Sequence, residues 1–157
     1  MRAFRVTGIV LARFLLSAIF LTAGIHKIFY WHEGEVALLN VLSEWQVHLE
    51  SFPSVQEFLS FLTSWTPLLL LGATLFELVG GLLLLLGVRE KLGAGLLVLF
   101  LIPTTVLFHQ FWFLDGSMRE LQQTMFLKNL AIIGGLMMVL LNGAQPFGKD
   151  NAAAFKF

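Results

Sequence analysis

Residues 67–87 read PLLLLGATLFELVGGLLLLLG, an apolar run whose single ionisable residue, Glu77, lies near its centre. A helix needs ~20 predominantly apolar residues to cross the roughly 30 Å of hydrocarbon in a bilayer. Leucine dominates the run, which shows none of the strict alternation of apolar and polar residues that marks a strand of a membrane barrel. The run therefore predicts a transmembrane helix.

Three further apolar runs of similar length occupy residues 6–29, 92–110 and 124–142. The chain as a whole is 57% hydrophobic and 13% charged, whereas soluble domains carry about 25% charged residues. Because so few charged residues cannot coat a water-facing surface, we expect an all-α membrane protein. It should form one membrane domain over residues 1–157, built as a bundle of four transmembrane helices.

The run at residues 6–29 shares some features with a secretory signal peptide, since Arg2 and Arg5 precede it and small residues lie near its end. It is longer than the roughly 7–15 apolar residues of a signal peptide, and Arg13 interrupts it. We therefore expect this segment to be a retained helix.

A long loop, residues 30–66, separates the first two predicted helices. Its frequent aromatic residues and low glycine and serine content are unlike a flexible linker, and its apolar residues recur at helical spacing on both sides of Pro53. Ser54 and Glu57 have the spacing of a capping box at the start of a helix. We expect two short amphipathic helices here, lying at the outer membrane interface.

Lysine and arginine gather in the cytoplasmic loops of membrane proteins. In a four-helix chain one side holds Arg2, Arg5, Arg89, Lys91, Lys149 and Lys156. Residues 30–65, on the other side, contain five acidic residues and neither lysine nor arginine. The sequence therefore predicts a multi-pass protein of the inner (cytoplasmic) cell membrane with both termini in the cytoplasm.

The ionisable residues within the predicted helices are the candidate functional residues. A charged side chain at membrane depth is costly, so it faces protein or a wet cavity and finds a partner. At 1.5 Å per residue, Glu77 lies roughly 15 Å from either end of its helix and Arg13 roughly 10 Å deep, so we expect these two residues to pair. A second polar cluster is expected in the outer third of the membrane: Lys27, His109, Lys128 and Asn129.

The ionisable residues among these also have plainer interpretations. Arg13 can snorkel to the headgroups, and Lys27 and Lys128 can be interfacial anchors. His109 can be an ordinary member of the aromatic belt. A buried ion pair can also serve only to lock two helices together. Glu77 is the hardest to explain in this way, because its side chain is too short to reach water from the midplane.

Several classes of site and partner are excluded. The four histidines are scattered and no Glu-x-x-His pair falls on one helix, so we predict no metal site. The absence of cysteine excludes thiol–disulfide chemistry and iron–sulfur clusters in this chain. A net charge of zero argues against a nucleic-acid partner. We predict no covalently bound cofactor, and the substrate and oligomeric state stay open.

The chain resembles the DoxX family of small four-helix membrane proteins, and the resemblance covers all four helices. The matching motifs are Arg13-Phe14-Leu15-Leu16 with Gly24 and Lys27-Ile28, Glu77-Leu78-Val79-Gly80-Gly81, Phe108-His109 with Trp112, and Phe126-x-Lys128-Asn129-Leu130-Ala131. The resemblance implies several activities. Some members are membrane subunits of oxidoreductase assemblies, one of them associated with thiosulfate:quinone oxidoreductase. Others belong to oxidative-stress complexes, and distant relatives act in protein sorting or chaperoning.

The leading hypothesis is a membrane subunit of an oxidoreductase complex with a quinone- or proton-linked site. Glu77 would carry the proton, His109 and Lys128 would contact the quinone headgroup, and Arg13 would set the charge state of Glu77. Lys27 and Asn129 would complete the binding site. Electrons would come from a partner subunit with a flavin or metal. The alternatives are a non-catalytic scaffold or chaperone and a small proton-coupled transporter.

Overall fold

The computed structural model describes residues 2–143, and every regular element in that range is helical. The elements are α1 (Arg2–Phe29), α2 (Trp31–His48), α3 (Pro53–Ser64), α4 (Thr66–Leu86), α5 (Glu90–Phe108), the 3₁₀ helix η1 (Phe111–Phe113) and α6 (Gly116–Asn142). Four segments are long and apolar enough to cross a membrane: Val6–Phe29, Thr66–Leu86, Glu90–Phe113 and Gly116–Asn142. The prediction of an all-α membrane protein with four spanning helices is confirmed. Lys149 and Lys156 lie outside the described residues.

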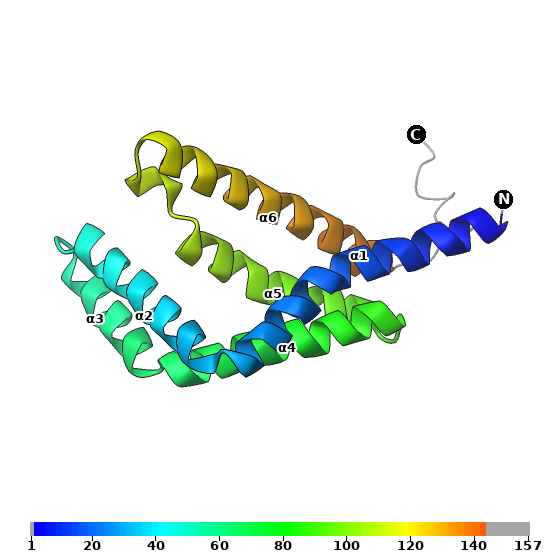
Figure 1. Cartoon of the computed structure of the whole chain (residues 1–157), viewed down its shortest axis with the longest axis horizontal. Helices are drawn as coiled ribbons and strands as arrows, with labels where there is room; N and C mark the ends of the chain where they lie inside the picture. Colours follow the sequence, from blue (N-terminus) through cyan, green and yellow to red (C-terminus); the bar gives the residue numbers. More distant parts are fainter. Residues whose placement is uncertain (1, 144–157) are drawn as a thin grey trace.

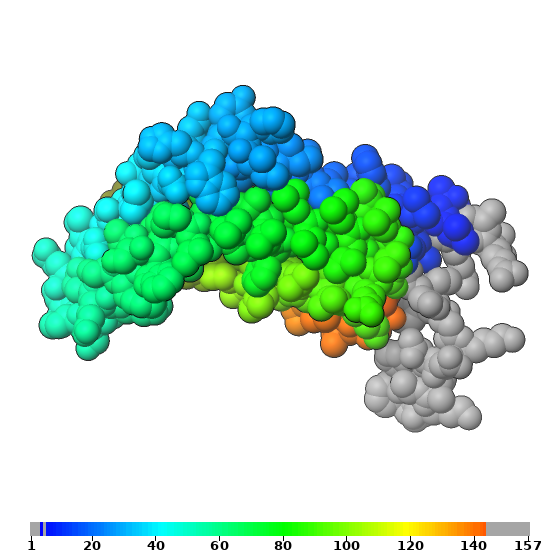
Figure 2. All heavy atoms as spheres, turned by 90° about the horizontal axis from the view of Figure 1, so that it is seen from below, coloured from blue at the N-terminus to red at the C-terminus, as the bar shows by residue number. Residues whose placement is uncertain are grey.

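The four long helices pack in chain order, α1 on α4, α4 on α5 and α5 on α6, as Figure 1 shows. Contact between α1 and α6 is slight, so the bundle is least closed between these two helices. In the view of Figure 2, α1 and α4 lie side by side over one face, and the orange end of α6 is visible at the edge beyond α5. The central core contains buried residues of all four helices, among them Phe20, Leu84, Leu97 and Leu136.

Two glycines set the register between the antiparallel helices α1 and α4. A Cβ atom on Gly24 would lie 2.8 Å from Leu78 Cδ2, and one on Gly81 would lie 2.9 Å from Leu21 Cδ2. Small residues let membrane helices approach closely. Gly24 therefore lies level with Leu78 and Leu21 with Gly81. The N-terminal part of α1 extends beyond the end of α4, as Figure 1 shows.

Helices α4 and α5 also approach each other closely at glycines. A Cβ atom on Gly93 would lie 2.8 Å from the carbonyl oxygen of Gly80. A backbone atom cannot move aside as the end of a flexible side chain can. Gly93→Ala should therefore force the two helices apart and destabilise the protein by about 1–3 kcal/mol, the usual effect of overpacking.

Thermal unfolding in detergent measures this effect, with Gly134→Ala in α6 as the control. No heavy atom lies within 4 Å of the position of a Cβ on Gly134. Alanine is a better helix former than glycine by roughly 0.5–1 kcal/mol, so this control should be neutral or slightly stabilising. Equal melting temperatures for the two variants would contradict the close packing of α4 on α5.

The loop between the first two spanning helices folds as a hairpin of α2 and α3, at the end of the bundle that we call the hairpin end (Figure 1). Leu38, Leu42 and Leu59 form a small buried core inside the hairpin. The indole Nε1 of Trp45 donates a hydrogen bond of 3.1 Å to the carbonyl oxygen of Leu107, which ties the hairpin to α5. The expectation of two short helices in residues 30–66 is therefore met.

Two predicted details of the helix ends are wrong. The capping box at Ser54 does not form, because α3 begins one residue earlier, at Pro53, and no side chain caps it. Proline suits the first turn of a helix, since its missing N–H would have no partner there. Helix α6 begins at Gly116 rather than at residue 124. A hydropathy pattern detects only the apolar part of a helix, and the first turns of α6 are polar.

Candidate functional site

A cavity of about 900 Å³ lies among the helices and is lined by residues from all six α-helices. Most of its lining is aliphatic or aromatic. The polar exceptions are Lys27, Glu77, Thr104, His109 and Asn129. A mostly apolar cavity with a few polar groups is typical of small-molecule sites.

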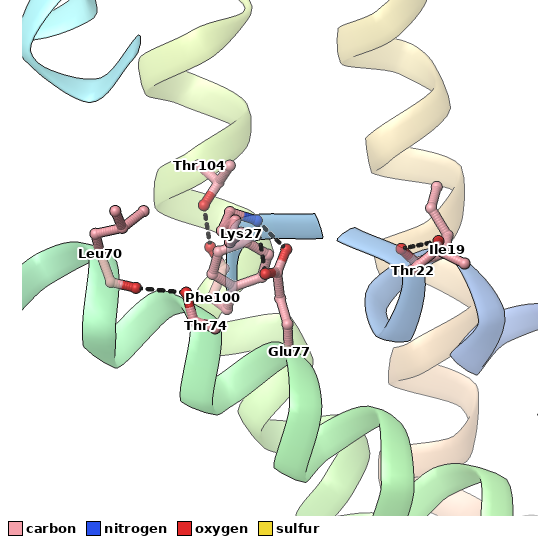
Figure 3. Close-up of polar contacts among 8 residues, drawn as sticks. All are labelled: Ile19, Thr22, Lys27, Leu70, Thr74, Glu77, Phe100 and Thr104. Carbon is pink, nitrogen blue, oxygen red and sulfur yellow. Dashed lines mark hydrogen bonds and ion pairs between the residues drawn. The ribbon is translucent and has the colours of Figure 1, made fainter. Parts of the chain in front are cut away.

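The polar centre of this cavity is an ion pair between α1 and α4. Lys27 Nζ donates to both carboxylate oxygens of Glu77, at 2.8 Å and 2.6 Å. Glu77 is 2% exposed, and the Lys27 ammonium lies 5.6 Å from the centroid of the Phe100 ring, where a cation–π contact adds to the pairing. Figure 3 shows the Lys27 and Glu77 side chains meeting beside Phe100 of α5. Bidentate pairing satisfies a carboxylate that would otherwise be buried without a partner.

Local sequence explains why this pair forms. Glu77 lies on the packed face of α4 together with Thr74, Gly80 and Gly81, all buried. A Cβ atom on Gly24 would lie 3.4 Å from Glu77 Cβ, so α1 is close to α4 at this level. Lys27 follows Gly24 by three residues and therefore lies on the same face of α1.

Neighbouring hydroxyl groups are satisfied within their own helices. Thr74 Oγ1 donates 2.8 Å to Leu70 O, and Thr104 Oγ1 donates 2.8 Å to Phe100 O, as Figure 3 shows. These back-bonds keep both hydroxyl donors away from Glu77. Lys27 is therefore the hydrogen-bond donor to the Glu77 carboxylate among the described residues.

His109 and Asn129 line the cavity from the side of α5 and α6. His109 Nδ1 lies 2.8 Å from Gln122 Oε1, and Asn129 Nδ2 donates 3.1 Å to Thr105 Oγ1. Gln122 did not emerge from the sequence, because its segment was predicted to precede the helix. Gln122 precedes Asn129 by seven residues, so both lie on one face of α6. This spacing was the feature of the sequence that could have identified Gln122.

Lys128 does not belong to this cluster. It is exposed on α6, and its Nζ lies 3.1 Å from Met125 Sδ of the same helix. Adjacent residues on a helix point about 100° apart, and here Asn129 lines the cavity while Lys128 does not. The expected cluster of four residues is therefore reduced to Lys27, His109 and Asn129.

The expected pairing of Arg13 with Glu77 is wrong. Arg13 instead forms an ion pair with Glu90 of α5, at the turn between α4 and α5. A Cβ atom on Gly87 of that turn would collide with the Arg13 guanidinium. Because α1 extends past the end of α4, Arg13 lies level with this turn, and Lys27 takes its place beside Glu77.

The arrangement suits an elongated ligand with one polar end. Within residues 2–143, no group of three or more histidine, aspartate or glutamate residues is placed to hold a metal ion. The cavity lining includes Leu68, Leu99 and Val106, each at least 42% exposed. An apolar tail can extend along these residues into the lipid while a headgroup contacts the polar centre.

Comparison with known proteins gives the family. The family model for DoxX matches residues 8–110, a range that includes Lys27, Glu77 and His109. The ER-derived vesicles protein ERV29 of Saccharomyces cerevisiae is 28% identical to this chain over 91 residues, which are 58% of this chain and 27% of ERV29. The chain thus spans about a quarter of that relative's length, and no solved structure matches it. Because the family model covers well over half of the sequence, the chain belongs to the DoxX family of membrane proteins.

Proposed function

We propose that this protein is the membrane subunit of an oxidoreductase complex and binds a quinone in the cavity around Lys27 and Glu77. The observation that carries the proposal is a cation and a carboxylate, paired at 2.6 Å, in a mostly apolar cavity with exposed aliphatic residues in its lining. A quinone has a headgroup that forms hydrogen bonds and an apolar tail. The headgroup matches the polar centre of the cavity, and the tail matches its aliphatic lining.

The donors present fit a quinone headgroup. Its carbonyl oxygens accept hydrogen bonds, and a lysine ammonium has three N–H donors. Glu77 accepts two of those from Lys27, which leaves one for a ligand. The Asn129 amide and the His109 ring supply further polar contacts from the side of α5 and α6.

A bound quinone would take up two electrons and two protons on reduction to the quinol. The electrons come from a partner subunit with a flavin or a metal centre. Glu77 would hold one of these protons at its carboxylate oxygens and release it to the quinone, and the second proton would come from water. Lys27 would set the charge state of that carboxylate, the role first expected of Arg13. Gln122 orients the His109 ring and Thr105 orients the Asn129 amide through their hydrogen bonds.

Filling the cavity should weaken quinone binding. Gly72 lines the cavity, and a Cβ atom there would meet no heavy atom within 4 Å. Gly72→Leu should therefore fold and occupy space needed by the ligand, with about a tenfold loss of quinone retained on purification, since a clash of this size costs about 1.4 kcal/mol or more. Gly134→Leu is the matched control, because its Cβ position is equally open but lies outside the lining.

Purification of the native complex in mild detergent tests the whole proposal. We expect a flavin- or metal-containing protein and a quinone to co-purify with the wild-type chain. If both the wild-type protein and Gly134→Leu were isolated without a partner protein and without quinone, the proposal would be contradicted.

The bidentate Lys27–Glu77 pair also fits a second function, that of a non-catalytic scaffold in which the pair only locks α1 to α4. A proton-coupled transporter would instead show substrate flux in liposomes that contain this protein alone. These outcomes separate the three functions.

We also propose that the chain acts as one membrane domain in the inner (cytoplasmic) membrane with both termini in the cytoplasm. Arg13, Arg89 and Lys91 lie together near the turn between α4 and α5. Cationic residues favour the cytoplasmic side, and four spans return the chain to the side on which it started.

A further inference from the structure

A second cavity, of about 540 Å³, lies at the end of the bundle opposite the hairpin, between α1 and the turn that joins α4 to α5. Its lining consists of Arg13, Gly87, Arg89, Glu90, Lys91 and Leu92. We propose that this cavity binds the phosphate group of an anionic phospholipid. It shares no lining residue with the cavity around Glu77.

Charge makes the cavity selective for anions. Three of its lining side chains are cationic and one is a carboxylate, so its net charge is positive. Glu90 pairs with Arg13. Lys91 Nζ donates 3.2 Å to the carbonyl oxygen of Leu141, which uses one of its three N–H donors. Arg89 is exposed. Guanidinium and ammonium groups are the side chains that bind phosphate.

Hydrogen-bond donors without a partner also favour an anion in this cavity. Arg13 Nε is buried and has no hydrogen-bond partner among the described residues. Helix α5 begins at Glu90, and no side chain caps its N-terminus. The first N–H groups of a helix and its dipole favour an anion at that end.

The backbone of the turn holds these groups together. Gly87 has φ 68°, and Arg89 has φ 49°, the one positive φ at a non-glycine residue in the described chain. A side chain at position 87 would collide with the Arg13 guanidinium. The left-handed conformation is unfavourable for arginine and persists where the surroundings enforce it.

Position in the membrane favours a lipid over free phosphate. The turn joins two spanning helices, α4 and α5, so it lies at the depth of the headgroups. Leu86, Val88 and Leu92 beside it are each at least 50% exposed. Acyl chains can cover these residues while the phosphate of the same lipid lies among the cations, and a free phosphate ion would leave them uncovered.

Titration of the detergent-solubilised full chain with phosphatidylglycerol tests this proposal, with thermal stability or native mass spectrometry as the readout. Arg89→Gln/Lys91→Gln should weaken binding about thirtyfold, and Arg89→Gln alone about fivefold, from the usual contribution of each basic residue near an anionic lipid. Arg119→Gln is the matched control, an exposed arginine near the start of α6 at the hairpin end. It should bind as the wild type does.

Titrations with two other compounds show whether the phosphate group comes from a lipid or from a free ion. We expect phosphatidylcholine and millimolar inorganic phosphate to give little stabilisation. Equal stabilisation by inorganic phosphate would assign the cavity to a free anion and overturn the lipid. Unchanged phosphatidylglycerol binding in Arg89→Gln, or equal losses in Arg89→Gln and Arg119→Gln, would overturn the site.

Discussion

Glu77→Gln should reduce quinone-linked electron transfer by the complex at least hundredfold, while the chain still inserts and assembles with its partner. Glutamine has nearly the same shape as glutamate but cannot take up a proton at its side-chain oxygen. Loss of a positioned proton carrier typically lowers a rate by about 10²–10⁴. Quinone reduction in isolated membranes, normalised to the amount of inserted protein, measures the effect.

The control is Glu57→Gln, which makes the same chemical change at an exposed carboxylate on α3. This variant should retain full activity. If Glu77→Gln were as active as Glu57→Gln, with the partner still bound, the pair would be a structural lock and the protein a scaffold. If Glu77→Gln lost its partner as well as its activity, the effect would be one of assembly.

Lys27→Met should destabilise the protein by about 3 kcal/mol. The substitution keeps an unbranched apolar side chain but leaves the Glu77 carboxylate, which is 2% exposed, without its cation. Removing one partner of a buried pair costs about 3–5 kcal/mol, and the partial exposure of Lys27, 25% of its side chain, puts the effect at the lower end. Thermal unfolding in detergent measures it.

The double variant Lys27→Met/Glu77→Gln separates charge from packing. It leaves no unpaired buried charge, so most of the lost stability should return. No gain over Lys27→Met alone would mean that the lysine stabilises α1 and α4 by packing, and that the ion pair contributes little.

The sequence was sufficient to predict the four spanning helices and to single out most of the polar residues that line the cavity. Length and hydropathy define a spanning helix without tertiary information. The cost of charge at membrane depth singled out Glu77, and Lys27, His109 and Asn129 line the same cavity as Glu77. The polar residues of the lining were therefore recognisable from residue type and depth, and their role as a functional site stays a prediction.

The pairing was not predictable, because it depends on the register between helices. The depth of Arg13 was counted from the start of the apolar run, whereas α1 begins at Arg2 and extends past the end of α4. The contact of Gly24 with Leu78 brings Lys27, rather than Arg13, to Glu77. Which glycines meet is a matter of packing, and periodicity along one helix does not reveal it.

The sequence also did not reveal how α6 is rotated about its own axis. Lys128 and Asn129 were both assigned to the cluster, although their side chains point about 100° apart on the helix. The choice between them needed the position of α5, since Asn129 donates to Thr105 while Lys128 is exposed.

Cross-linking tests the contact between positions 27 and 77 most directly, and the natural absence of cysteine provides a clean background. The variant Lys27→Cys/Glu77→Cys would be treated in native membranes with a bifunctional thiol reagent about as long as the two replaced side chains. A protease site inserted between α2 and α3 then separates the two positions unless they are joined. We predict that the fragments stay joined in this variant and separate in Arg13→Cys/Glu77→Cys; the reverse pattern would contradict the Lys27–Glu77 site.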